Sequence, residues 1–159
     1  MLRLRARGRG FPAWLVDSMA GVFHCLHRMT TTTKEEMISF RVTKLVRSDL
    51  DDLAALRGIG SGPLAATFVI EGLKRLRFQV IDFRDAAPGR VAYLTGTRWP
   101  VWMIVQLVAE HDGDCAAAAK HMKKPSALVE MVMRYAQAFP EEIAACLRLN
   151  ERRAKEARA

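Results

Sequence analysis

Residues 37–43 (Met-Ile-Ser-Phe-Arg-Val-Thr) alternate between apolar and polar side chains with the period of two expected of a strand. Ile38, Phe40 and Val42 fall on one face, and the other face carries Met37, Ser39, Arg41 and Thr43. A lone strand leaves its hydrogen-bonding edges unpaired and its apolar face in water, and no second strand follows at hairpin distance. The segment therefore needs a partner from elsewhere, which limits the folds open to this chain.

Two helices are predicted directly after this strand. Thr43 is placed to cap the first, and Gly58 suits the left-handed position at its end. Ser61 is expected to cap the second, with Pro63 in its first turn. Their apolar stripes, which recur at helical spacing and should face a core, are Val46, Leu50, Leu53 and Ala54, then Leu64, Ala65, Phe68, Val69, Gly72 and Leu73.

One strand and two helices do not enclose a core alone, because so small a unit buries too little apolar surface. Two copies solve this. Their strands pair antiparallel across a two-fold axis, and four helices cover a dimer core of Ile38, Phe40 and Val42. The polar face of the two-stranded ribbon then points outward, where it fits the DNA major groove. The alternative is an ordinary strand and helical hairpin within one larger core.

This part of the chain resembles a ribbon-helix-helix module, from Met37 to about Leu76. The resemblance rests on the run 38–42, on a first helix that ends in Leu53-Ala54 and Gly58, and on Ser61 opening the second helix. A homodimer that binds a two-fold-related DNA operator is what the resemblance implies.

The same resemblance assigns contacts to individual residues. Met37, Ser39 and Arg41 would contact base edges: Arg41 suits guanine, Ser39 suits either base type, and Met37 offers apolar contact alone. The backbone N–H groups of Ser61 and Gly62 would hold a phosphate at the helix N-terminus. Pro63 departs from the pattern because it removes one N–H donor.

The second half of the chain predicts a short hairpin followed by helices. Residues 80–83 and 90–94 are the expected strands, around a turn at 85–89 that contains Pro88-Gly89. Four helices are expected: Val101 to His111, a short one capped by Asp114 that ends near His121, Ser126 to Ala138 with Ser126 as its cap, and a last one that has Pro140 in its first turn and dissolves into a polar tail after Asn150.

The short helix, the Lys123-Lys124-Pro125 turn and the helix after it have helix-turn-helix proportions. Lys120, Lys123 and Lys124 would contact phosphate. The recognition helix would present Ser126, Glu130 and Arg134. Because that face is not basic, a solvated helix pair within a bundle is an equal alternative. The fold class expected for the whole chain is mainly α with short β.

A second resemblance covers roughly Met37 to Asn150. Leu94-Thr95-Gly96-Thr97-Arg98, Val101-Trp102, Arg134-Tyr135-Ala136 and Phe139-Pro140-Glu141-Glu142-Ile143 are similar to a family of uncharacterised function with a helix-turn-helix domain. Proteins of that family resemble VapB-type antitoxins, and several join a ribbon-helix-helix-like front to this rear domain. The resemblance implies a DNA-binding autoregulator that neutralises a PIN-like ribonuclease toxin. A protein-interaction module without specific DNA binding is the alternative.

The positive charge is unevenly distributed. Of the formal net charge of +8, half comes from residues 1–28, which hold five arginines and one aspartate. Met29 offers an alternative start, so a basic extension would precede the patterned chain. The expected divisions are 1–36 (a disordered extension), 37–77 (the ribbon-helix-helix-like unit), 78–150 (hairpin and helix-turn-helix domain) and 151–159 (polar tail).

Enzyme chemistry, metal binding and membrane insertion are not expected. No P-loop, nucleophile elbow or dinucleotide fingerprint occurs, no apolar run reaches membrane-spanning length, and the three cysteines show no CxxC spacing. His24, Cys25 and His27 lack a fourth metal ligand. His111, Cys115 and His121 straddle a turn, and scattered histidines and cysteines are more often structural. We therefore expect a cytoplasmic protein with no catalytic residues, no metal and no cofactor.

Overall fold

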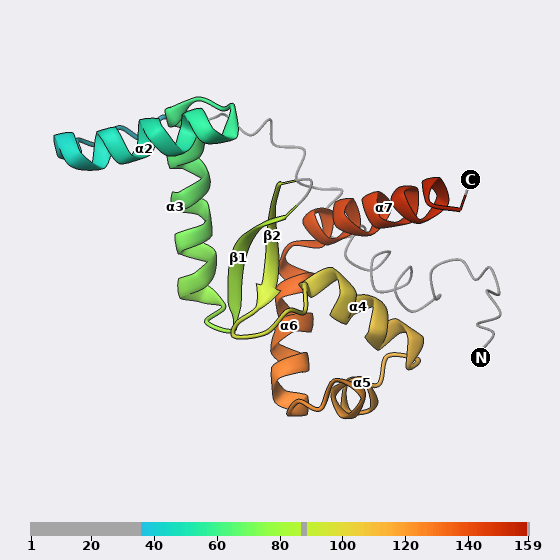
Figure 1. Ribbon diagram of the computed structural model, residues 1–159. Helices are drawn as coiled ribbons and strands as arrows, with labels where there is room; N and C mark the ends of the chain where they lie inside the picture. Colours follow the sequence, from blue (N-terminus) through green and yellow to red (C-terminus); the bar gives the residue numbers. More distant parts are fainter. Residues whose placement is uncertain (1–35, 87–88, 159) are drawn as a thin grey trace. The chain divides into compact units, whose positions relative to one another are not determined.

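The computed structural model describes residues 36–86 and 89–158. These residues form six helices and one two-stranded antiparallel sheet, which confirms the mainly α class with short β (Figure 1). The chain divides into two units, 1–41 and 42–159, and of the first unit the structure describes residues 36–41. The predicted extension and its candidate start Met29 lie outside the described residues, as do His24, Cys25 and His27. The order of elements is α2 (Lys44–Arg57), α3 (Ser61–Arg77), β1 (Ile81–Ala86), β2 (Gly89–Leu94), α4 (Val101–Glu110), α5 (Cys115–Met122), α6 (Ser126–Ala138) and α7 (Pro140–Glu156).

The strand predicted for residues 37–43 is absent from the single chain, where residues 36–43 are neither helix nor strand. Ile38 is 82% exposed, and Phe40 and Val42, the other members of the predicted dimer core, are exposed as well. The physical reason is the one that the sequence raises: a strand needs a neighbour to take its backbone hydrogen bonds, and one chain supplies none at this segment.

Helix α2 begins and ends where its sequence signals predict. The Thr43 hydroxyl accepts a hydrogen bond from the backbone N–H of Val46. Gly58 closes the helix in the left-handed region at φ 63°, where a side chain would be strained. The predicted core-facing stripe is wrong in part, because Ala54 is buried whereas Val46 and Leu53 are exposed.

Helix α3 starts one residue away from the predicted cap. Gly60 holds the N-cap position, and Ser61 is the first helical residue. The Ser61 hydroxyl donates to the carboxylate of Asp51 in α2 instead of capping its own helix. Of the predicted apolar stripe, Leu64 is buried but Val69 and Leu73 are exposed, and the buried charged residue of this helix is Glu71.

The hairpin is longer than the sequence predicts. β1 and β2 pair in a register that runs from Ile81 opposite Leu94 to Ala86 opposite Gly89. Asp85, Ala86 and Gly89, expected in the turn, therefore belong to the strands, while residues 87–88 lie outside the described part. A further bridge joins Tyr93 to Pro100, just before α4.

The main core lies between this hairpin and helices α4 to α7. Its buried residues are Ile81, Phe83, Ala92, Leu94, Val101, Ile104, Val105, Leu107, Val108, Ala118, Ala119, Met122, Val129, Val132, Tyr135 and Ile143. Helix α6 contributes Val129, Val132 and Tyr135 to this core, and all three are buried. At the centre, the Tyr135 ring packs edge-on against Phe78, with 5.3 Å between ring centroids, and lies 4.8 Å from Phe139.

The ends of helices α5 to α7 follow the predicted local signals, with two exceptions. Asp114 caps α5, since its carboxylate accepts from the N–H groups of Ala116 and Ala117. Ser126 is not the cap of α6, because Pro125 holds that position and Ser126 is the first helical residue. Helix α7 does not dissolve after Asn150 but continues to Glu156.

Ion pairs connect α3 to the rest of the unit at three residues, Glu71, Lys74 and Arg75, and Arg75 pairs with Asp82 of β1 at 2.7 Å. Arg90 in β2 donates two hydrogen bonds to Glu71, at 2.7 and 2.6 Å, and Glu71 is only 6% exposed. Lys74 contacts Glu142 of α7 at 2.5 Å, and the hydroxyl of Tyr135 donates to the other oxygen of the same carboxylate at 2.8 Å. Charged side chains therefore connect α3 to both strands of the hairpin and to α7.

No single helix in residues 36–86 and 89–158 has the length and apolar composition to cross a membrane; α2 and α3 pass this test as a pair, although the chain bends by 101° between them.

Candidate nucleic-acid interface

The three residues predicted to contact bases lie in the segment 36–43. Met37, Ser39 and Arg41 are all exposed, and Met37 reaches 94%. They belong to the unit 1–41, whereas the other candidate contacts belong to the unit 42–159. All three side chains are accessible to a large ligand. Their placement on one face of a two-stranded ribbon stays a prediction.

The predicted phosphate site at the start of α3 has an acidic neighbour. Besides the hydrogen bond from Ser61, the carboxylate of Asp51 accepts one from Arg47 Nε at 2.9 Å. These hydrogen bonds, from Ser61 first and then Arg47, hold the pKa of Asp51 below its usual value. The Ser61 hydroxyl is thus engaged, and the phosphate prediction for Ser61 and Gly62 rests on backbone N–H groups beside a negative charge.

The α5–α6 pair retains the predicted proportions. A three-residue connection joins an eight-residue helix to one of 13 residues, and Lys123 takes a left-handed conformation at φ 53°. Lys120, Lys123 and Lys124 are exposed on α5 and this connection. On α6, Glu130 and Arg134 are exposed on one face, and Ser126 is half-buried. The structure leaves these side chains accessible, and their use in binding stays a prediction.

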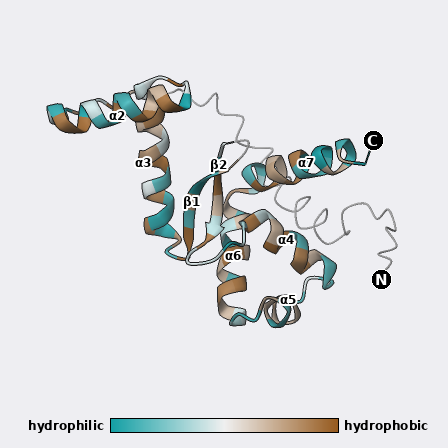
Figure 2. Ribbon diagram, in the orientation of Figure 1, coloured by the Kyte–Doolittle hydropathy of each residue, from teal (hydrophilic) through white to brown (hydrophobic). Residues whose placement is uncertain are grey.

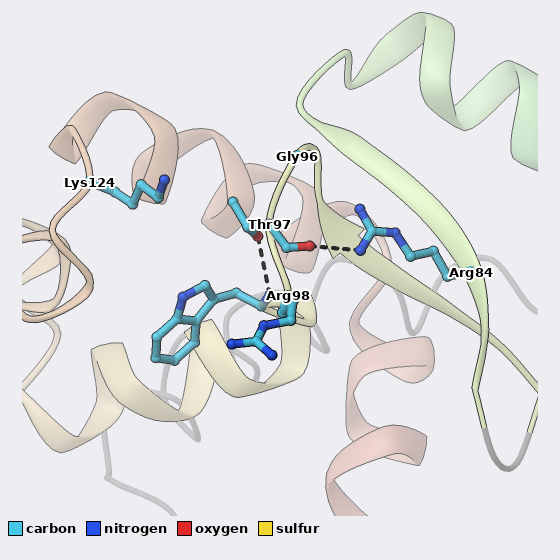
Figure 3. A pocket seen from close by; sticks show the side chains of 6 residues that line it. Arg84, Gly96, Thr97, Arg98 and Lys124 are labelled. Atoms are coloured by element: carbon cyan, nitrogen blue, oxygen red, sulfur yellow. Dashed lines mark hydrogen bonds between the residues drawn. The ribbon is translucent and has the colours of Figure 1, made fainter.

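A basic depression lies beside the α5–α6 connection (Figure 3). It has a volume of about 510 Å³, is open to solvent, and brings together strand β1, the loop after β2 and the helical connection. None of its six lining residues is acidic: they are Arg84, Gly96, Thr97, Arg98, Trp99 and Lys124. We call this the Arg98 depression. It brings Lys124, a predicted phosphate contact, together with the further cations Arg84 and Arg98.

Arg84 is held in place at the edge of the Arg98 depression. Its guanidinium donates to the carbonyl oxygen of Thr97 at 2.7 Å, as Figure 3 shows, and lies 5.1 Å from the ring centre of Tyr93. Its ion pair with Asp82 is long, at 3.4 Å, and Asp82 pairs more closely with Arg75, at 2.7 Å. The charge of Arg84 is therefore only partly compensated.

Arg98 and Lys124 are both exposed, and in the part of the chain that the structure describes neither forms an ion pair. Sequence reasoning found Lys124 through the helical connection but missed Arg84 and Arg98. Arg98 stands in the Gly96-Thr97-Arg98 run that carries a family resemblance, and the signal that could have marked it is a positive side chain directly after a glycine-containing loop. Arg84 was missed because it lies between the predicted strand, 80–83, and the predicted turn, 85–89.

His111 follows α4, and Cys115 and His121 lie in α5. The rings of His111 and His121 meet edge-on, with 5.7 Å between centroids. Burial raises the pKa of the Cys115 thiol, with smaller contributions from Glu130 and Asp114. Among the described residues, no group of three histidine, cysteine, aspartate or glutamate side chains is placed to hold a metal ion.

Comparison with known proteins places the chain in no group: no protein-family model, no curated protein and no solved structure matches it.

Proposed function

We propose that this protein is a homodimeric DNA-binding regulator of the antitoxin type. In the proposed dimer, residues 37–43 of two copies pair as an antiparallel ribbon, supported by α2 and α3. Met37, Ser39 and Arg41 face the operator, while Ile38, Phe40 and Val42 are covered. The α5–α6 pair adds contacts to the same DNA as a helix-turn-helix.

The distribution of exposed apolar side chains carries this proposal. Among the described residues, 15 large hydrophobic side chains are exposed, and 13 of them lie between Met37 and Leu76. The rest of the described chain contributes only Met103 and Met131. Figure 2 shows these apolar positions alternating with polar ones along α2 and α3. Monomeric proteins rarely leave so much apolar surface in one region, and such a region is typical of a protein–protein interface.

A second copy is the occupant that best fits this region. The run 37–43 has the alternation of a strand but no neighbour in its own chain, and an antiparallel copy supplies the missing backbone hydrogen bonds. Pairing two-fold about that ribbon is isologous, so each copy covers the same face of the other. One event would thus satisfy both the backbone of residues 37–43 and the apolar side chains of α2 and α3.

The dimer is testable with charges placed on the exposed apolar helices. Leu56→Asp combined with Leu73→Asp is expected to give a monomer in analytical ultracentrifugation, because both side chains would be buried beside apolar partners in the dimer. Met131→Asp, on an exposed apolar residue outside residues 37–76, is the matched control and should stay dimeric. An unaltered protein that sediments as a monomer at micromolar concentration contradicts the proposal.

Operator binding is testable at Arg41. Arg41→Ala should weaken binding to a duplex carrying the protein's own promoter by about 1–3 kcal/mol, the usual worth of a bidentate arginine–guanine contact. Fluorescence anisotropy measures the loss, and Arg77→Ala, which removes an exposed arginine from the last turn of α3, should bind as the unaltered protein does. Absence of any binding at low salt would discard the operator model.

A protein-interaction module without specific DNA binding is the second candidate. The acidic Asp51 beside the start of α3 favours it, because an operator phosphate approaching Ser61 and Gly62 would meet a like charge. In that case the ribbon serves dimerisation alone, and any residual DNA binding would be indifferent to Arg41→Ala.

The toxin partner rests on the family resemblance together with the charge of the stretch from Arg148 to Arg158. That stretch carries five basic residues against Glu151 and Glu156, and its net positive charge suits the acidic metal site of a PIN-like ribonuclease. Co-expression with the product of the neighbouring reading frame tests this part. A neighbour that is not a nuclease, or one that does not co-purify, counts against it.

A further inference from the structure

We infer that the Arg98 depression is a binding site for a phosphate group of the DNA backbone, formed by Arg98 and Lys124 and ordered by Arg84. The inference rests on the proposed DNA-binding function and adds to it a site built from three separate elements. It differs from the sequence-based assignment, which placed phosphate contacts on Ser61 and Gly62 and on Lys120, Lys123 and Lys124 but included neither Arg84 nor Arg98.

The charges of the depression favour an anion. Three cationic side chains line one concavity without an acidic residue, and Arg98 and Lys124 have no ion pair among the described residues. Like charges that share a depression repel one another, so a bound anion lowers the energy of all three. Arginine and lysine are also the side chains that most often contact phosphate, arginine through two parallel N–H bonds and lysine as a point charge.

The loop geometry gives the site a fixed frame. Thr97 uses its carbonyl to accept from Arg84 at 2.7 Å and its hydroxyl to accept from the backbone N–H of Trp99 at 3.1 Å. The same hydroxyl donates to the carbonyl of Leu94 at 2.8 Å. Arg98 therefore projects from a loop that hydrogen bonds connect to both strands of the hairpin. A contact from an ordered loop loses less conformational entropy on binding than one from a flexible loop.

The shape of the depression favours a phosphate of a large ligand over a free one. It is shallow and open to solvent, so a small anion would keep much of its hydration and be held weakly. A duplex presents its phosphates on a convex surface and is retained by its other contacts at the same time. The neighbouring Lys120 and Lys123 extend the positive charge along the same connection.

The expected readout is the salt dependence of binding. Arg98→Ala combined with Lys124→Ala should reduce the magnitude of the slope of log K against log salt by about 1, because the two side chains hold one phosphate group. Affinity for the promoter duplex and for a scrambled duplex should fall by the same factor, because phosphate contacts carry no sequence information. Each single variant should reduce the magnitude of the slope by no more than the double variant does, whereas Arg77→Ala should leave it unchanged.

Three outcomes overturn the inference in distinguishable ways. If the double variant binds both duplexes with the unaltered slope, the site does not contact DNA, and the proposed function stands without it. If the unaltered protein binds no duplex at low salt, the operator model fails and the DNA ligand fails with it. If inorganic phosphate binds saturably in calorimetry and the double variant abolishes that binding, the site takes free phosphate instead. Thermal melting of the variants, which change exposed side chains, should match the unaltered protein.

Discussion

Replacing Glu71 by alanine should lower the free energy of unfolding by about 3 kcal/mol or more, the loss expected when one partner of a buried ion pair is removed. Glu71 is 6% exposed and accepts two hydrogen bonds from Arg90. These hydrogen bonds are the largest of the interactions that raise the pKa of the Arg90 guanidinium. In the variant, the Arg90 guanidinium keeps its hydrogen bond to the Phe83 carbonyl, at 3.0 Å, and a longer ion pair with Asp85, at 3.4 Å. Urea denaturation followed by circular dichroism measures the change.

Two further variants separate the ion pair from general packing. Arg47→Ala removes an exposed pair to Asp51 and should change stability by about 0.5 kcal/mol or less. Glu71→Leu combined with Arg90→Met removes both charges and fills the space, and it should recover most of the loss because apolar replacements of buried pairs are often neutral. A Glu71→Ala variant no less stable than Arg47→Ala would show that the pair contributes little.

This ion pair illustrates what the sequence could not predict. Glu71 lies in a helix whose apolar stripe can be read from its spacing, but its partner Arg90 is 19 residues further along, in a strand. Periodicity reports which residues share a face and says nothing about which element will cover that face. The same limit explains why Val69 and Leu73 were expected in a core and are exposed in the single chain.

Helix boundaries were predictable where one local interaction determines them. Thr43, Gly58 and Asp114 act at the predicted positions because each satisfies backbone groups within its own helix end. The caps expected at Ser61 and Ser126 are wrong by one residue, since Gly60 and Pro125 take the extended backbone that precedes each helix. The polar stretch after Asn150 stays helical in α7, in keeping with the high helix propensity of its Ala, Arg, Lys and Glu residues.

The candidate site was predictable only in the part that is continuous in sequence. Lys124 was found because it follows a short helix, whereas Arg84 and Arg98 reach the same depression from the hairpin and from the loop after it. That convergence depends on the register that places Ile81 opposite Leu94. The turn residues alone did not fix this register, because the strands continue into the segment expected as turn.

The largest loss from a single side chain is expected at Tyr135, which is fully buried at the centre of the core. Tyr135→Ala should reduce the free energy of unfolding by about 3–5 kcal/mol, because the cavity would remove the aromatic contacts to Phe78 and Phe139 together with the apolar burial. Tyr135→Phe keeps the ring and loses only the hydrogen bond to Glu142, so it should cost about 1.5–3 kcal/mol. Denaturant titration measures the free energy of unfolding of both variants. Equal losses would mean that the Tyr135 hydroxyl, and not its ring, provides the stabilisation.

The pH dependence of the phenylalanine variant tests the hydroxyl separately. Burial first, and then the carboxylate of Glu142, raise the pKa of Tyr135 far above its usual value. A folded-state pKa above the unfolded one means that folding favours the neutral phenol, so its contribution is complete below about pH 10 and declines as pH rises beyond that value. The unaltered protein should therefore lose more stability than Tyr135→Phe between neutral and strongly alkaline pH, since all other titrating groups are common to both. Parallel pH profiles would contradict a buried, neutral phenol that donates to Glu142.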